Sequence, residues 1–229
     1  MHDTRALTLS LPDLPGGPTT VSALMDAPPG ARACCVLAHG AGAGMAHPFM
    51  AATATGLAQR GIACLRYQFP FMERGSKRPD TPAVAHAAVR AAVVAAAQQW
   101  PGVPLVAGGK SFGGRMSSQA QAAQPLPGVR GLVFFGFPLH PAGRPAQERA
   151  AHLAQVACPM LFLQGTRDEL ADATLMAQTV HALGPRATLV AVDQADHAFH
   201  VPARSGRSDA EVLGALLDDV AAWVARLAA

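Results

Sequence analysis

In LVAGGKSFGGRM, residues 105–116, an apolar run leads into a glycine-rich turn and then into a helix-forming segment. Residues 109–113 fit the pattern G-x-S-x-G, which predicts a buried strand, a sharp turn with Ser111 at its apex, and a helix. Glycines two residues before and after Ser111 are needed because a Cβ there would collide with a neighbouring strand or helix. Taken alone, the pattern also fits an ordinary tight turn. A phosphate-binding loop is excluded, because Pro104 stands where that motif needs its first glycine.

Length and composition indicate one well-buried globular domain over residues 1–229. Half of the 229 residues are hydrophobic and 14% are charged, which argues against disorder. The net charge is only +3 and no basic run occurs, so we expect no nucleic-acid partner. The chain has no uninterrupted apolar stretch of about 18 residues and no apolar signal core at its start. We therefore expect no membrane span and a cytoplasmic protein, either a monomer or a homodimer.

The four cysteines, Cys34, Cys35, Cys64 and Cys158, lie in or beside predicted strands. Adjacent Cys34 and Cys35 would point to opposite faces of one strand. No C-x-x-C motif is present, so we expect buried, reduced thiols and neither a metal site nor a cofactor.

Apolar runs alternate with helical segments along most of the chain, which predicts an α/β fold with a mostly parallel sheet covered on both faces. The predicted strands are 4–10, 20–25, 33–38, 62–67, 103–108, 129–135, 160–164 and 187–192, the first two forming an antiparallel hairpin around a turn at 12–18. The predicted helices are 48–59, 82–100, 112–124, 148–157, 171–183 and 209–227.

Ser111, Asp168 and His197 each follow a predicted strand directly. The carboxyl ends of parallel strands share one edge of the sheet, so we expect these three side chains to meet there. A serine hydroxyl needs a base within hydrogen-bond reach, and the base needs a carboxylate to fix its tautomer. The order serine, acid, histidine is the one that α/β-hydrolases use.

Alternatives remain for the acid and the base. Asp168 fits a helix cap near residue 170, and Glu169 and Asp172 are rival acids. His200 is a rival base, and Asp196 fits a role in bending the turn. We prefer Asp168 because a Gly-x-x-Asp turn after a strand places a short carboxylate inward, and His197 because it comes first after the last strand.

A second glycine-rich stretch, HGAGAG at residues 39–44, follows the predicted strand 33–38. Glycine and alanine here allow the backbone to approach a substrate carbonyl closely, as in an oxyanion loop. We expect His39 to brace this loop through hydrogen bonds rather than to act as the base. An ordinary strand-to-helix turn is the alternative.

The chain resembles the α/β-hydrolase superfamily over nearly its full length. HGAGAG at 39–44, GGKSFGGR at 108–115 and Asp196-His197 resemble, more narrowly, a small dienelactone-hydrolase-like branch. That branch is related to the hydrolase-like domain of a nuclear acetyltransferase complex subunit. Dienelactone hydrolases carry cysteine at the nucleophile position, where this chain has Ser111, so the lactone substrate is not carried over. The resemblance implies Ser111 as nucleophile, Asp168 as acid and His197 as base.

The same resemblance implies an oxyanion hole made by the N–H groups of Phe112 and Ala41, with Gly42 as the alternative second donor. Only residues 136–158 separate two of the strands between which many relatives insert a helical cap. We expect no cap and an open site for small or flexible acyl groups. In the long loop 68–82, Phe69, Phe71 and Met72 are expected either to line an acyl pocket or to plug its rim.

These observations predict a serine hydrolase that cleaves carboxylic esters or thioesters through an acyl-enzyme. Peptidase activity would use the same three groups. The alternative from another class is a hydrolase-fold interaction module with little or no turnover, which the resemblance to a chromatin-complex subunit motivates.

Overall fold

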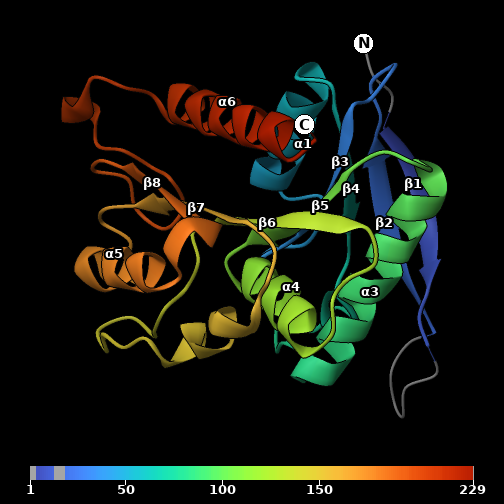
Figure 1. Cartoon of the computed structure of the whole chain (residues 1–229), viewed down its shortest axis with the longest axis horizontal. Coiled ribbons are helices and arrows are strands. Elements are labelled where there is room, and N and C mark those ends of the chain that lie inside the picture. Colours follow the sequence, from blue (N-terminus) through green and yellow to red (C-terminus); the bar gives the residue numbers. More distant parts are fainter. Residues whose placement is uncertain (1–3, 13–18, 229) are drawn as a thin grey trace.

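The computed structural model describes residues 4–12 and 19–228 and arranges them around one central sheet (Figure 1). The strands are β1 (Thr4–Ser10), β2 (Thr20–Asp26), β3 (Ala33–Ala38), β4 (Ile62–Tyr67), β5 (Leu105–Lys110), β6 (Val129–Phe135), β7 (Met160–Gly165) and β8 (Ala187–Val192). Their order across the eight-stranded sheet is β1-β2-β4-β3-β5-β6-β7-β8. Strand β2 pairs antiparallel with β1 and with β4. Every pairing from β4 to β8 is parallel, as the sequence predicts.

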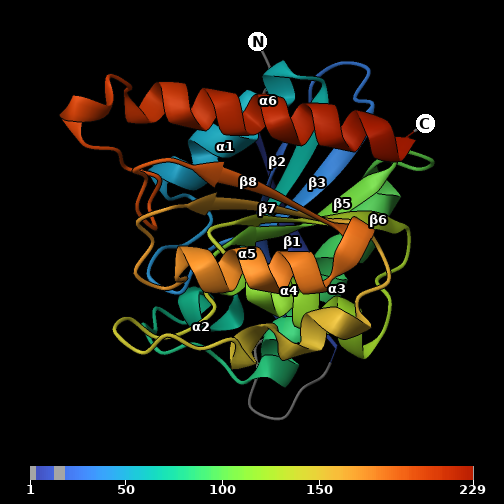
Figure 2. The same ribbon diagram turned by 60° about the vertical axis from the view of Figure 1, so that its left-hand side comes forward.

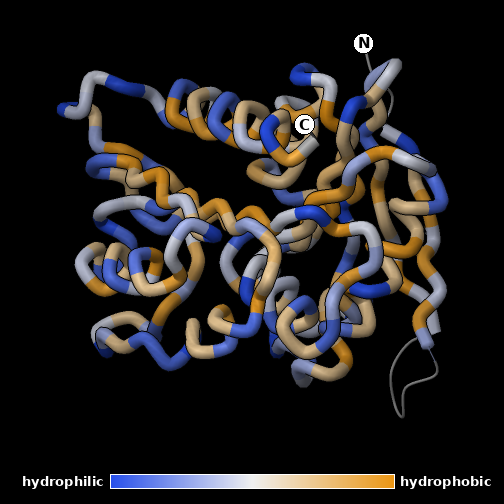
Figure 3. The backbone as a smooth tube through the Cα atoms, in the orientation of Figure 1, coloured by the Kyte–Doolittle hydropathy of each residue, from blue (hydrophilic) through white to orange (hydrophobic). Residues whose placement is uncertain are grey.

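Helices cover both faces of the sheet (Figure 2). The α-helices are α1 (Pro48–Gln59), α2 (Pro70–Glu73), α3 (Pro82–Gln99), α4 (Phe112–Ala123), α5 (Ala173–Ala182) and α6 (Asp209–Ala228), and the 3₁₀ helices are η1 (Glu148–Gln155), η2 (Gly184–Arg186) and η3 (Ala203–Ser205). Apolar side chains of α1 and α6 pack on one face, and those of α3, α4 and α5 pack on the other. Along α6 the hydropathy alternates, as expected of a helix with one buried side (Figure 3).

The central strands are buried on both faces, which explains their unbroken apolar sequences. Every residue of β3 and of β4 is buried. Within β3, Cys34 packs into one core and Cys35 into the other, which confirms that the two thiols point to opposite faces. All four cysteines are free thiols, and Cys158 alone of them is partly exposed.

The loop 68–82 differs from the sequence prediction. The loop 68–82 contains the short helix α2, which begins at Pro70. Proline is favourable at this position because the first N–H groups of a helix have no partner within the helix. Phe69 and Phe71 are fully buried, and their rings pack on Phe112 with centroids 5.2 and 6.0 Å away. The two rings therefore pack against the first residue of α4. Both rings are fully buried, so the prediction that Phe69 and Phe71 line an acyl pocket is wrong, whereas the alternative, that they plug its rim, agrees with their burial. The predicted turn at 12–18 falls almost wholly outside the described residues.

The segment between β6 and β7 contains η1 as its only regular element, and the fold has no lid over the carboxyl edge of the sheet. This confirms the expectation drawn from the short spacing between those strands. Among the residues that the structure describes, no helix is both long enough and apolar enough to cross a membrane.

Candidate active site

Ser111 stands between the last residue of β5 and the first residue of α4 with φ 50° and ψ −114°. A positive φ is unusual for a residue with a side chain, and such strain persists where the surroundings enforce it. Those surroundings leave no room beside the turn. A Cβ on Gly113 would lie 2.5 Å from the carbonyl oxygens of Ala38 and His39, and one on Gly109 would collide with Ala38 as well. The two glycines of the motif are thus required by the close approach of β3.

Asp168 and His197 are brought together from the ends of β7 and β8. The Nδ1 atom of His197 lies 2.7 Å from Oδ2 of Asp168, whose side chain is fully buried. Oδ2 also accepts a hydrogen bond from Gln164 at 2.5 Å, and Oδ1 accepts one from the backbone N–H of Leu170 at 2.8 Å. These contacts fix the carboxylate. Because its Nδ1 bonds to Asp168, His197 presents Nε2 to the remainder of the site.

Ser111 and His197 line the same cavity, of about 430 Å³. Its other lining residues are Gly40, Ala41, Gly42, Ala43, His47, Phe49, Met50, Lys110, Leu170 and Ala198. The sequence prediction placed Ala41 and Gly42 beside the reacting carbonyl, and both lie in this wall. Phe112 is the first residue of α4, so its backbone N–H is one of those left unpaired at a helix start. The cavity therefore combines a serine, a histidine and part of the glycine-rich loop with a largely apolar wall, next to the start of α4.

His39 is completely buried and braces the glycine-rich loop, as expected from the sequence. Its Nε2 accepts a hydrogen bond from the backbone N–H of Phe69 at 2.9 Å, so that nitrogen carries no proton. Its Nδ1 lies 2.7 Å from the carbonyl oxygen of Gly40 and donates to it. Burial lowers the pKa of His39 to about 4, which keeps the ring neutral. The ring thus connects the loop to the segment after β4.

The structure gives the rival residues other partners. Asp172 caps α5 by accepting a hydrogen bond from Leu175 at 2.9 Å. His200 pairs with the carboxylate of Asp209 at 2.9 Å. Asp196 accepts hydrogen bonds from backbone groups of its own turn, as the bending role requires. Asp168 does not start a helix: its bond to the N–H of Leu170 closes a local turn.

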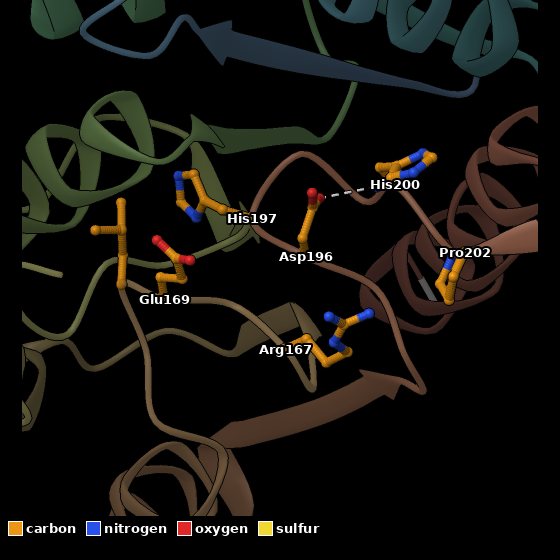
Figure 4. A pocket seen from close by; sticks show the side chains of 7 residues that line it. Arg167, Glu169, Asp196, His197, His200 and Pro202 are labelled. Carbon is orange, nitrogen blue, oxygen red and sulfur yellow. Dashed lines mark hydrogen bonds between the residues drawn. The ribbon is translucent and has the colours of Figure 1, made fainter. Parts of the chain in front are cut away.

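Glu169 is exposed and lies in a second cavity next to His197 (Figure 4). Its side chain therefore does not replace Asp168 behind the imidazole.

Lys110 belongs to the site but was not predicted to. Its ammonium group donates a hydrogen bond to the backbone carbonyl of His197. The nitrogen also lies 5.4 and 5.9 Å from the ring centroids of Phe199 and Phe49. Burial lowers the pKa of Lys110 to about 8, and the charges of Asp168 and Asp196 partly oppose that shift. The signal was a lysine as the last residue of a buried strand, directly before the apex serine, because its side chain starts beside the site.

A second serine–histidine pair lies away from this cavity. Ser118, in the middle of α4, has its Oγ 2.8 Å from Nε2 of His152 in η1. Burial and the nearby Arg115 lower the pKa of His152 to about 4. None of the described carboxylates is hydrogen-bonded to His152. Ser118 also stands in regular helix, without the exposed turn that Ser111 occupies, so the pair lacks two parts of a hydrolytic site.

The chain resembles known α/β hydrolases in both sequence and structure. Residues 31–225 match a family model described as an alpha/beta hydrolase domain. A dienelactone hydrolase from Anabaena variabilis has a similar structure, with TM-score 0.77, 19% identity and 98% of each chain covered. An α/β serine hydrolase without lid from Xanthomonas campestris gives TM-score 0.74 and 24% identity over 96% of this chain and 95% of that one. The esterase domain of a Rhodothermus marinus protein gives 0.72 and 18%, with 98% of each chain covered. At these identities the likeness establishes the fold.

Proposed function

Because the chain belongs to the alpha/beta hydrolase domain family, we propose that it is a serine hydrolase in which Ser111, His197 and Asp168 act together. One observation carries the proposal. A serine held at positive φ lines the same cavity as a histidine whose Nδ1 is 2.7 Å from a buried carboxylate. We propose carboxylic esters or thioesters with small or flexible acyl groups as the substrates, since the fold has no lid to enclose a long chain.

The proposed mechanism follows from these positions. Nε2 of His197 removes the proton of Ser111 as Oγ attacks the substrate carbonyl, and Asp168 stabilises the resulting imidazolium. The N–H groups of Phe112 and Ala41, or Gly42 in place of Ala41, stabilise the oxyanion. His197 then gives its proton to the departing alcohol or thiol. A water molecule that His197 deprotonates next attacks the acyl-enzyme, releasing the acid and restoring Ser111.

The narrower resemblance to the dienelactone-hydrolase-like branch is part of this proposal. A dienelactone hydrolase and an esterase domain among the similar structures support an ester bond as the target. We do not extend the lactone substrate to this chain, because its nucleophile position holds Ser111. We further propose that residues 1–229 form one domain.

Labelling with a fluorophosphonate, followed by intact mass, tests the nucleophile directly. We expect one adduct on the wild type, none on Ser111→Ala, and an unchanged adduct on Ser118→Ala. Hydrolysis of p-nitrophenyl butyrate should fall at least about a thousandfold in Ser111→Ala, as in other triads that lose their serine. Ser118→Ala is the matched control, because it removes a buried serine that is hydrogen-bonded to a histidine away from the cavity of Ser111.

The labelling experiment also addresses the interaction module. A folded wild type that takes no adduct and hydrolyses no ester would refute the hydrolase and favour a binding role. Loss of the adduct in Ser118→Ala alone would instead move the nucleophile to the second serine–histidine pair.

A further inference from the structure

Two cavities of different character meet at His197. The first, of about 430 Å³, contains Ser111 and the glycine-rich loop and has a mostly apolar wall. The second, of about 650 Å³, contains the charged side chains of Arg167, Glu169 and Asp196. His197 and Leu170 line both cavities, so the histidine forms part of the boundary between them.

The chemistry of acyl transfer assigns one half of a substrate to each cavity. In the tetrahedral intermediate, the carbonyl oxygen must face the backbone donors of the glycine-rich loop. The leaving oxygen must face Nε2 of His197, which gives it a proton. The acyl group then stays in the cavity that holds Ser111. The leaving group passes over His197 into the charged cavity, which does not include Ser111 among its lining residues.

The charges of the second cavity are not evenly placed. In Figure 4 the carboxylate of Glu169 lies on the same side as the imidazole of His197, whereas Arg167 lies beneath Asp196. Asp196 already accepts hydrogen bonds from the backbone N–H groups of Ala198 and His200, at 2.7 and 3.0 Å. The carboxylate of Glu169 has no hydrogen bond or ion pair within the described part of the chain. It is therefore available to a ligand.

Arg167 and His200 lie farther from Glu169 than His197 does (Figure 4). A hydrogen bond and the charge of Asp209 raise the pKa of His200, while nearby Arg167 acts in the opposite direction. The imidazole of His200 is already paired with Asp209 at 2.9 Å. A leaving group that enters past His197 thus meets the carboxylate of Glu169 before it reaches Arg167.

We propose that Glu169 is a specificity-determining residue and that the preferred substrates join a compact apolar acyl group to a leaving group that carries a positive charge. This inference rests on the proposed serine hydrolase and assigns its two substrate halves. The carboxylate attracts the cation while the ester lies at Ser111, so it contributes to kcat/KM and not to the activation of the nucleophile.

The test compares two esters of equal shape, butyrylcholine and 3,3-dimethylbutyl butyrate, of which only the first is charged. We expect the wild type to prefer the charged ester by about twofold to fivefold in kcat/KM, the upper part of the range of an exposed ion pair. In Glu169→Gln that preference should disappear, and in wild type it should shrink as salt is raised from 0.05 to 0.5 M. Glu148→Gln, at an exposed position outside the charged cavity, is the matched control.

The outcomes separate this inference from the proposal beneath it. Fluorophosphonate labelling of Ser111 and hydrolysis of p-nitrophenyl butyrate report the hydrolase without any charged leaving group. If both persist in every variant while wild type shows no preference for butyrylcholine, the role of Glu169 is refuted and the hydrolase stands. An equal loss of preference in Glu148→Gln also refutes it. Absence of labelling and of turnover refutes both.

Discussion

At the scale of single residues, the ammonium group of Lys110 is the least expected feature of the site. Its pKa in the folded protein is lowered to about 8 by burial, whereas the unfolded chain keeps an ordinary lysine pKa. Between pH 8 and about 10 the unfolded state therefore binds more protons than the native state. Stability contributed through this group must rise with pH across that window.

Replacement of Lys110 by methionine removes this titration. The free energy of unfolding of wild type minus that of Lys110→Met should increase by about 1 kcal/mol for each pH unit between 8 and 10. Urea unfolding at pH 7, 8, 9 and 10 measures the difference, and groups that titrate in both proteins cancel. A difference that stays flat across this range would show that Lys110 keeps its proton in the native state.

The sequence allows prediction of residues whose place follows from the order of strands and turns. It does not allow prediction of contacts between side chains that are far apart in the chain. Ser111, Asp168 and His197 could be predicted to lie at one edge of the sheet because each directly follows a strand, and their order resembles that of the α/β-hydrolases. Lys110 was missed, since the pattern G-x-S-x-G leaves its position open. The Ser118–His152 contact joins α4 to η1 over 34 positions, and no local pattern predicts such a pair.

At the scale of elements, the glycine-rich loop 39–44 depends on contacts from the segment after β4. His39→Leu keeps a side chain of similar bulk but leaves the buried N–H of Phe69 without its acceptor. An unsatisfied buried amide costs about 1–3 kcal/mol, which lowers the melting temperature by roughly 2–12 °C in a domain of this size. Activity should also fall, mainly in kcat, because the loop that is proposed to hold the oxyanion moves.

His181→Leu is the control for this change, because His181 is exposed near the end of α5. We expect it to stay within about 0.5 kcal/mol of wild type and to keep full turnover. Thermal unfolding and steady-state kinetics on the three proteins provide both readings. Equal behaviour of the two variants would show that His39 does not brace the loop.

Length and composition explain which elements the sequence predicted. The buried strands are short, unbroken apolar runs that end at turn residues, and the helices α3 and α6 extend over many residues. Helix α2 has only four residues and begins at Pro70, so its sequence is indistinguishable from a loop. What places it is the tertiary packing of Phe69 and Phe71 against the ring of Phe112, which no local pattern records.

At the scale of the whole molecule, the antiparallel hairpin is joined to the parallel sheet by a buried ion pair. Arg66 on β4 donates to Asp26 on β2 at 2.8 Å, and the two side chains are 4% and 1% exposed. Asp26 also accepts a hydrogen bond from Thr4 on β1 at 2.6 Å. The same guanidinium donates to the carbonyl of Met45 at 3.0 Å, next to the glycine-rich loop. One cluster therefore links both strands of the hairpin to the site.

Loss of one member of this pair should be much worse than loss of both. Arg66→Met removes the guanidinium that pairs with the buried Asp26 carboxylate, and we expect a loss of about 3–5 kcal/mol in the free energy of unfolding. The double variant Asp26→Leu with Arg66→Met removes the buried carboxylate as well and should recover most of that loss, since apolar residues can replace a buried ion pair at little net cost. Urea unfolding of the single and double variants at pH 7 distinguishes the cases. If the double variant is as unstable as Arg66→Met, the Met45 and Thr4 contacts, and not the charge pair, hold the hairpin to the sheet.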